Sequence, residues 1–302
     1  MRSGEYPWLV ALGAMWGLSY VFYRVGAPAL GPALFVELRV LLAGAVLLVY
    51  LAGRGQLTAT RARLRARWRP YLVLGALNGA IPFTLIAIAE LTLPASFASV
   101  LNSTAPLFSA VLGIPLLGQR IGARQGAGIA LGIGGVLVLV GAAPFTLTAV
   151  VIASAIASLL AAFAYGLAAI YVRRRLPGER PLDLSVGQQL TAALWLLPFA
   201  VVELPGAHPT EPALVSVLGI ALVSTALAYA IYFRILQSTG PTEALTVTFL
   251  IPIFGVLWGF LLLREPLGLG LLAGVALILA GVALATQVHG SARSRAPGSS
   301  SG

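Results

Sequence analysis

The fold is decided by the stretch PASFASVLNSTAPLFSAVLGIPLLGQRIGARQGAGIALGIGGVLVLVG, residues 94–141. A related stretch follows after a shift of 146 residues and reads GPTEALTVTFLIPIFGVLWGFLLLREPLGLGLLAGVALILAGVALATQ, residues 240–287. In one ungapped register Pro106 aligns with Pro252 and Phe108 with Phe254. Four glycines of the first copy also align with glycines of the second: Gly113, Gly122, Gly128 and Gly135. These matches in a single register indicate a duplicated unit.

The composition around this duplication is that of an integral membrane protein. Of the 302 residues 59% are hydrophobic and only 9% are charged, whereas a soluble domain is roughly half apolar and a quarter charged. The apolar runs are long and rich in Leu, Ala and Gly, which favours helices over the short alternating strands of a membrane barrel. Because each helical span needs about 20 residues, ten helices use nearly the whole chain and leave no room for a soluble enzyme domain.

Hydropathy therefore predicts an all-α membrane protein with ten transmembrane helices. The expected spans are 8–27, 32–51, 71–91, 95–115, 122–141, 148–172, 184–203, 212–235, 242–262 and 267–287. They form two five-helix repeats, residues 8–141 and 148–287. Because five is odd, the second repeat enters the membrane from the opposite face, and the repeats are inverted. The polar Gly/Ser-rich tail 288–302, whose final residues resemble a cloning remnant, is excluded from the fold.

The positive charge is placed where it orients the protein in the membrane. The net charge is +10 and there is no lysine. Most arginines lie in the predicted polar connections 52–70 and 173–183, which is typical of cytoplasmic loops under the positive-inside rule. Both termini are then cytoplasmic. This placement argues against nucleic-acid binding, for which the net charge alone would be a signal.

Several kinds of chemistry lack the residues they require. There is no cysteine, and the two histidines, His208 and His289, lie in a predicted loop and in the tail, so neither a metal centre nor another cofactor is expected. The GxxxxGK[ST] phosphate loop is absent, as are HExxH and GxSxG. The chain is therefore predicted to be neither an enzyme nor an ATP-driven P-loop pump.

Polar and aromatic residues recur at helical spacing on several predicted spans. Such stripes favour a hydrophilic path or a substrate cavity inside the bundle. The alternative is that small and hydroxyl residues serve helix packing and that some tyrosines belong to the interfacial belt. The cavity candidates are Trp16, Tyr20, Asn78, Ser99, Asn102, Ser158, Tyr165, Gln188 and Tyr229.

Four ionisable residues fall within predicted spans, where charge is costly and usually functional. They are Arg24, Glu37, Arg39 and Glu90. Arg24 is expected to pair with Glu37 or Glu90, as an outer lock or beside a proton-titrating carboxylate. The alternatives are a static salt bridge, or snorkelling of Arg24 and Glu90 to the interface.

The aligned prolines and the glycine-rich helices suggest mechanical roles. Pro106 and Pro252 each weaken a helix one turn earlier, and they are either hinges or fixed kinks. The fifth and tenth spans are almost purely apolar, with GxxxG pairs at Gly128/Gly132 and Gly270/Gly274. These two spans are predicted to serve packing or dimerisation at the periphery of any cavity.

Three features together resemble a known family. They are the polar-to-proline segment Asn102 to Pro106, the glycine-rich helix that closes each repeat, and the turn LLLREPLG at residues 261–268. With Arg39 early in the second helix, they make the chain similar to EamA-type members of the drug/metabolite transporter superfamily over residues 8–287. The first repeat departs from the pattern, since Gln119 occupies the position of Glu265.

This resemblance implies a secondary transporter of a bacterial inner membrane, working by alternating access on a small-molecule substrate, with protons as a possible coupling ion. Within the superfamily the chain is most similar to YddG-type exporters of amino acids, aromatic ones included. Two alternatives remain open. One is export of drugs or other metabolites such as nucleosides or sugars, and the other is a membrane receptor or scaffold without transport.

Overall fold

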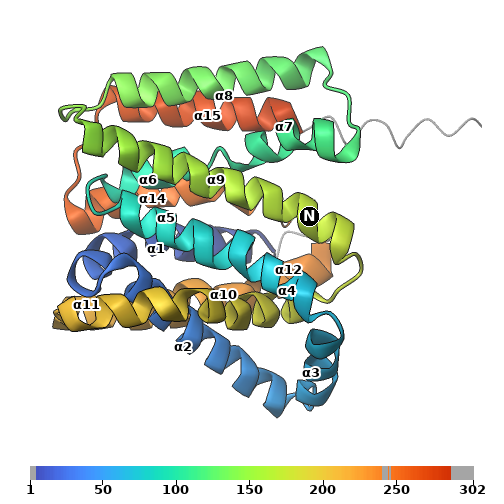
Figure 1. Cartoon of the computed structure of the whole chain (residues 1–302). Helices are drawn as coiled ribbons and strands as arrows, with labels where there is room; N and C mark the ends of the chain where they lie inside the picture. The colour runs from blue at the N-terminus through green and yellow to red at the C-terminus, as the bar shows by residue number, and fades with distance from the viewer. Residues whose placement is uncertain (1–4, 240–243, 245, 287–302) are drawn as a thin grey trace, which may run out of the picture.

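A computed structural model describes residues 5–239, 244 and 246–286 of the chain. The predicted tail 288–302 lies outside the described residues, as do residues 242, 243, 245 and 287 of the predicted ninth and tenth spans. Within the described part the regular elements are all helical (Figure 1). The all-α prediction is confirmed.

Nine helices of the described part are long and apolar enough to cross a membrane. In the first half they are Tyr6–Leu30 (α1), Pro32–Gly53 (α2), Trp68–Ala89 (α4, η2 and α5), Ala95–Leu117 (α6 and α7) and Ala123–Gly141 (α8). In the second half they are Ala149–Arg175 (α9), Pro181–Gly206 (α10 and η3), Glu211–Leu236 (α11, η4 and most of α12) and Leu269–Thr286 (α15). A tenth apolar helix, Val247–Leu263 (α14), has 17 residues. That length reaches the lower end of the roughly 17–25 residues that span a bilayer, so the ten predicted spans are confirmed.

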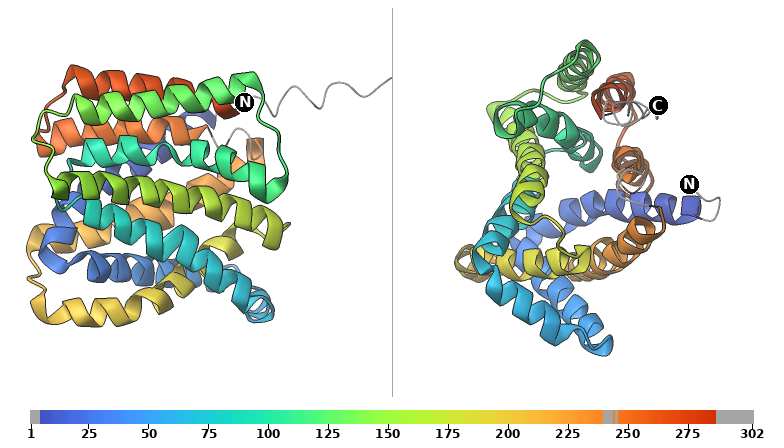
Figure 2. Two further views of the ribbon diagram at one scale, coloured as in Figure 1. Left: turned by 45° about the horizontal axis from the view of Figure 1, so that its top comes forward. Right: turned by 90° about the vertical axis from the view of Figure 1, so that its right-hand side faces the viewer.

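Corresponding helices of the two halves make corresponding packing contacts. α1 packs along α14 of the second half, and α9 packs correspondingly along α6 and α7 of the first. α2 packs against α10, and α8 against α15. Figure 1 shows α8 and α15 side by side at one edge of the bundle and α2 at the other, and Figure 2 shows the same layers from two further directions. The packing thus has the approximate twofold relation expected of a duplicated chain.

Glycines make the closest of these contacts possible. A Cβ atom on Gly17 of α1 would lie 2.6 Å from the Cβ of Phe254 on α14. In the second half, Gly166 of α9 lies against Phe108 of α7, where a Cβ would lie 3.0 Å from the Phe108 Cβ. Phe108 and Phe254 are the aromatic residues that the duplication aligns. The repeated motif therefore sets the same close approach of two helices twice.

The loop predicted at residues 52–70 contains a helix, α3 (Leu57–Ala66), and the first turn of α4 (Trp68–Gly75). The reason is an amphipathic spacing that the hydropathy of membrane spans does not detect. Leu57, Thr60 and Leu64 recur every three to four residues and lie on one face of this short helix. The sequence analysis treated this stretch only as a polar connection and did not foresee the helix.

The fourth span is divided where its proline lies. α6 (Ala95–Asn102) ends before Ser103, and α7 (Ala105–Leu117) begins with Pro106 in its first turn, where proline is tolerated. The hydroxyls of Ser103 and Thr104 each donate to the carbonyl three residues earlier. Pro252 lies inside the unbroken helix α14. The two prolines thus occupy different settings, and a hinge at either stays a prediction.

The third helix of each half contains a short π-helical segment that the sequence analysis did not foresee. η2 (Ala76–Ala80) lies between α4 and α5 (Ile81–Ala89), and η4 (Leu222–Leu227) lies between α11 (Glu211–Ala221) and α12 (Ala228–Thr239). A π segment adds a residue to one turn and shifts the side chains that follow. Asn78 lies in η2 and Thr225 in η4.

Gly128 tests the packing of α8 against α15. A Cβ on Gly128 would lie 2.6 Å from the backbone nitrogen of Ala285, whereas nothing lies within 4 Å of one on Gly134 in the same helix. We expect Gly128→Ala to lower the thermal midpoint in detergent, at a cost of about 1–3 kcal/mol for overpacking. Gly134→Ala is the matched control and should leave the midpoint unchanged or slightly raised. Equal midpoints for both variants would contradict this packing.

Candidate functional site

A buried arginine lies at the centre of the bundle. Arg39 of α2 is 6% exposed, and its Nε donates a hydrogen bond to Thr225 Oγ1 at 3.2 Å. Its Nη1 donates to the hydroxyl of Tyr23, and its guanidinium carbon lies 3.7 Å from the centre of the Phe83 ring. Within the described residues no carboxylate forms an ion pair with it. Hydroxyls and ring faces therefore hold a buried positive charge that an anionic ligand group can still neutralise.

Amide and aromatic side chains from both halves contact one another in the same bundle. Asn102 Nδ2 of α6 donates to the hydroxyl of Tyr20 on α1 at 2.8 Å. Asn78 Nδ2 donates to Gln188 Oε1 of α10 at 2.5 Å, and Gln188 Nε2 donates back to the Asn78 carbonyl at 3.1 Å. The Gln188 side chain also hydrogen-bonds Tyr229. The contact between Asn78 and Gln188 joins the two halves of the chain, whereas the contact between Asn102 and Tyr20 joins two spans of the first half.

Three of the predicted aromatic candidates form ring pairs. Trp16 lies edge-on to Tyr229, with ring centres 6.2 Å apart, and Tyr165 of α9 lies 6.3 Å from Phe83. Sequence reasoning did not select Phe83, because its span offered no polar stripe around it. Phe83 follows the π segment η2 by three residues, and it lies beside Arg39 only in the packed structure.

The side chains of the polar centre differ in exposure. The arginine-rich end carries α3 and residues 176–180, and the arginine-poor end carries residues 91–94 and 207–210. Along α1 Trp16 is half-buried, whereas Tyr23 is 1% and Ala27 0% exposed as the helix approaches the arginine-poor end. Asn78, Asn102, Tyr165 and Tyr229 are also half-buried. These four side chains are therefore not fully enclosed, and we expect solvent to reach them from the arginine-rich end, which the labelling prediction below tests.

Two predicted cavity residues, Ser99 and Ser158, are fully buried in helix contacts. Ser99 is 0% exposed, donates to the Ser96 carbonyl of its own helix at 2.8 Å and packs where Gly255 leaves room. Ser158 is also 0% exposed and donates to the Ala98 carbonyl of α6 at 3.2 Å. In this conformation both serve helix packing, which was the alternative interpretation of the serine stripes.

An ion-pair network links the helices at the arginine-rich end. Asp183, at the start of α10, accepts from Arg63 at 2.7 Å, from Arg180 at 2.7 Å and from Thr60 at 2.6 Å. Glu179 accepts from Arg67 at 2.8 Å and from the Tyr71 hydroxyl at 3.0 Å. The hydrogen bond to Asp183 raises the pKa of Arg180. We call these seven residues the basic-end clamp. The clamp links α3 and α4 to the start of α10 and to the connection between α9 and α10. Its signal in the sequence is that the acidic residues Glu179 and Asp183 lie in an arginine-rich connection.

At the arginine-poor end a carboxylate of the second half caps a helix of the first. Glu265 Oε1 accepts from the Ala95 amide at 2.7 Å, and its Oε2 accepts from the Ser96 amide at 2.9 Å. These are two of the amides that the first turn of α6 leaves without a partner in the helix. Similarly, Glu203 Oε2 accepts from the Leu34 amide in the first turn of α2 at 2.9 Å. Carboxylates at helix N-termini are also favoured by the helix dipole.

The predicted ion pair of Arg24 with Glu37 or Glu90 was wrong. Arg24 Nη1 donates instead to the backbone carbonyls of Glu90, at 2.5 Å, and Leu91, at 3.0 Å. These carbonyls end the helix α5 and have no partner further along it, so they attract the cation. Glu90 is 0% exposed, and neither of its carboxyl oxygens has a hydrogen-bond partner. Glu37 is 4% exposed, and its Oε2 is buried without a hydrogen-bond partner.

Helix number, internal symmetry and a half-buried polar centre are those of a multi-pass membrane transporter built from a repeated unit. Comparison with known proteins agrees. The model of the EamA-like transporter family matches twice, over residues 4–141 and 152–287. The chain belongs to the EamA-like transporter family, whose members are transporters and not enzymes.

Relatives match over nearly the whole length. The uncharacterized transporter YvbV of Bacillus subtilis is 28% identical, covering 91% of this chain and 89% of the relative. A probable amino-acid metabolite efflux pump of Salmonella typhimurium is 29% identical over 89% of this chain and 90% of the relative. Protein PecM of Dickeya dadantii is 30% identical, over 91% of this chain and 89% of the relative. A crystal structure at 19% identity has the same fold, with a TM-score of 0.65 over 95% of this chain and 97% of that one.

Single cysteines test the difference in access, because the natural chain has none. Asn102 is half-buried and Ala98, one turn away on α6, is 0% exposed. We expect a small membrane-impermeant thiol reagent to label Asn102→Cys at least about tenfold faster than Ala98→Cys when it is applied at the arginine-rich face, because only the thiolate in water reacts. Faster labelling of Asn102→Cys from the opposite face would contradict access from the arginine-rich end.

Proposed function

We propose that the protein exports amino acids, aromatic ones included, across a bacterial inner membrane by alternating access. The observation that carries the proposal is the buried guanidinium of Arg39, which has hydroxyl and ring partners but no carboxylate among the described residues. An α-carboxylate is the group that such a cation would bind, through two parallel hydrogen bonds. The name of the Salmonella relative, an amino-acid metabolite efflux pump, supports the same substrate class.

The surrounding side chains suit the rest of an amino acid. The carbonyl oxygen of Asn102 is buried and lacks a hydrogen-bond partner, so it can accept from the substrate ammonium group. The rings of Trp16, Tyr165 and Tyr229 supply flat apolar surface for an aromatic side chain. Drugs and other metabolites such as nucleosides or sugars, the alternative substrates, do not in general offer a carboxylate to Arg39.

The described conformation corresponds to the cytoplasm-facing step of the cycle. The two repeats, 8–141 and 148–287, are taken as inverted, and the arginine-rich end with both termini as cytoplasmic, in keeping with the positive-inside rule. Export then requires the arginine-poor end to open while the helices at the arginine-rich end close behind the substrate. Flexing near Pro106 and Pro252 would supply this movement.

Liposome uptake tests the substrate class. We expect saturable uptake of labelled phenylalanine or tyrosine, competed by neutral amino acids. Arg39→Gln should reduce it at least about tenfold, because a charge-assisted bidentate pair is lost, and Arg39→Lys should retain part of it. Arg175→Gln, at an exposed position of the arginine-rich end, is the control and should transport normally. Absence of amino-acid uptake by folded protein in sealed liposomes would reject the amino-acid assignment and leave drugs, nucleosides and sugars.

Coupling to protons is proposed to reside on a buried carboxyl group. Glu90 has no hydrogen-bond partner for either oxygen, and so does not depend on a fixed ion pair for its position. We expect Glu90→Gln to abolish the stimulation of transport by an imposed proton gradient while exchange of substrate across the membrane persists. Glu37→Gln, measured in parallel, separates the two candidates. A gradient effect that survives in both variants would remove proton coupling through these groups.

A further inference from the structure

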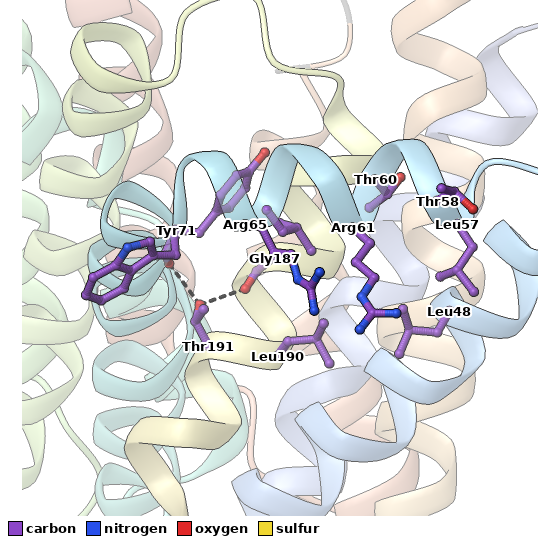
Figure 3. A pocket seen from close by; sticks show the side chains of 12 residues that line it. Leu48, Leu57, Thr58, Thr60, Arg61, Arg65, Tyr71, Gly187, Leu190 and Thr191 are labelled. Carbon is purple, nitrogen blue, oxygen red and sulfur yellow. Dashed lines mark hydrogen bonds between the residues drawn. The ribbon is translucent and has the colours of Figure 1, made fainter.

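A pocket at the arginine-rich end lies apart from the polar centre. Its volume is about 590 Å³, within the roughly 300–1,000 Å³ typical of small-molecule sites. Its walls come from the ends of α2 and α4, from α3 and from α10 (Figure 3). Figure 3 shows Arg61 and Arg65 of α3 extending across it toward Leu48 and Leu190. None of the contacts described for the substrate path uses these four side chains.

The two arginines differ from their neighbours on the same helix. Arg63 and Arg67 belong to the basic-end clamp and pair with Asp183 and Glu179. Arg61 and Arg65 are one turn apart on the pocket side of α3, are exposed and form no ion pair with the described residues. Two uncompensated guanidinium groups at i and i+4 make a site for an anion, and the Thr58 hydroxyl beside them adds a donor.

The rest of the pocket is apolar and continues toward the membrane interior. Leu48, Leu57, Leu64 and Leu190 line it. One turn beyond Leu190 on α10, Leu194 is 66% exposed, and on α4 Val73 is 40% exposed. In a membrane protein such exposed apolar side chains contact acyl chains. A bound molecule can therefore place an anionic group on the arginines and an apolar chain along the same groove.

We propose that this pocket binds an anionic phospholipid of the cytoplasmic leaflet. The phosphate contacts Arg61 and Arg65, and an acyl chain lies against Leu48 and Leu190. Trp68, 55% exposed at the rim, suits the headgroup level where tryptophan is enriched. Arginine-lined pockets between helices on the cytoplasmic side have the chemistry that anionic headgroups require.

The lipid also stabilises the basic-end clamp, because two residues are shared between the clamp and the pocket. Thr60 lines the pocket and donates to Asp183, and Tyr71 lines it and donates to Glu179. A lipid held against α3 therefore opposes the separation of α3 and α4 from α10. Anionic lipid acts through this contact on the end of the transporter that faces the cytoplasm, whatever the substrate is.

Native mass spectrometry of the full-length protein with phosphatidylglycerol or phosphatidylcholine tests the site. We expect phosphatidylglycerol to bind more tightly than phosphatidylcholine. Arg61→Gln/Arg65→Gln should weaken its binding at least about tenfold, since each basic residue near an anionic lipid adds to the electrostatic attraction. Arg173→Gln/Arg174→Gln removes the same charge from exposed positions outside the pocket and should bind like the natural protein. Leu190→Trp, which fills the groove without changing charge, should also weaken binding.

Thermal unfolding in detergent gives a second readout. Phosphatidylglycerol should raise the midpoint of the natural protein and of the Arg173/Arg174 variant, but not that of the Arg61/Arg65 variant. Glycerol phosphate, which has the anionic group without acyl chains, should not compete. The proposal is overturned by equal binding of the two lipids, by equal losses in both double variants, or by full competition from glycerol phosphate, which would assign the pocket to a soluble anion.

Discussion

Close approach of helix backbones at glycine is the constraint on which the rest of the structure depends. A bilayer supplies little hydrophobic driving force between helices, so their association rests on tight packing and on polar contacts. Gly17 against Phe254 and Gly166 against Phe108 are two copies of one contact, and Gly128 with Gly281 joins the helices that end the repeats. With these helices held together by backbone contacts, the centre of the bundle can hold polar and charged side chains.

The centre contains groups whose burial is costly unless something compensates it. Arg39 is held by a tyrosine hydroxyl, a threonine hydroxyl and an aromatic face, and the carboxyl oxygens of Glu90 have no partner at all. A protein that only had to be stable would gain by replacing such groups with apolar ones. Their presence is consistent with a ligand or a proton providing, for part of a cycle, the compensation that the resting contacts lack.

The sequence allowed the architecture to be predicted because its signals are strong and repetitive. Long apolar runs located ten spans, and the alignment of Pro106 and Phe108 with Pro252 and Phe254 located the duplication. Finer features depend on interactions between segments far apart in the chain. Helical spacing selected Ser99 and Ser158 together with Asn102, but only the packed structure shows that the serines are fully buried in helix contacts while the asparagine is half-buried. Likewise, hydropathy gave no sign of η2, η4 or α3.

The capping of α6 by Glu265 joins the two halves of the chain through backbone chemistry as well as through packing. The amides of Ala95 and Ser96 belong to the first half, and the carboxylate that satisfies them belongs to the second. The duplication therefore did not yield two self-sufficient units, since the first five helices alone would present bare amide groups near the membrane boundary. Glu265 of the second copy and Gln119 at the aligned position of the first are therefore no longer chemically interchangeable.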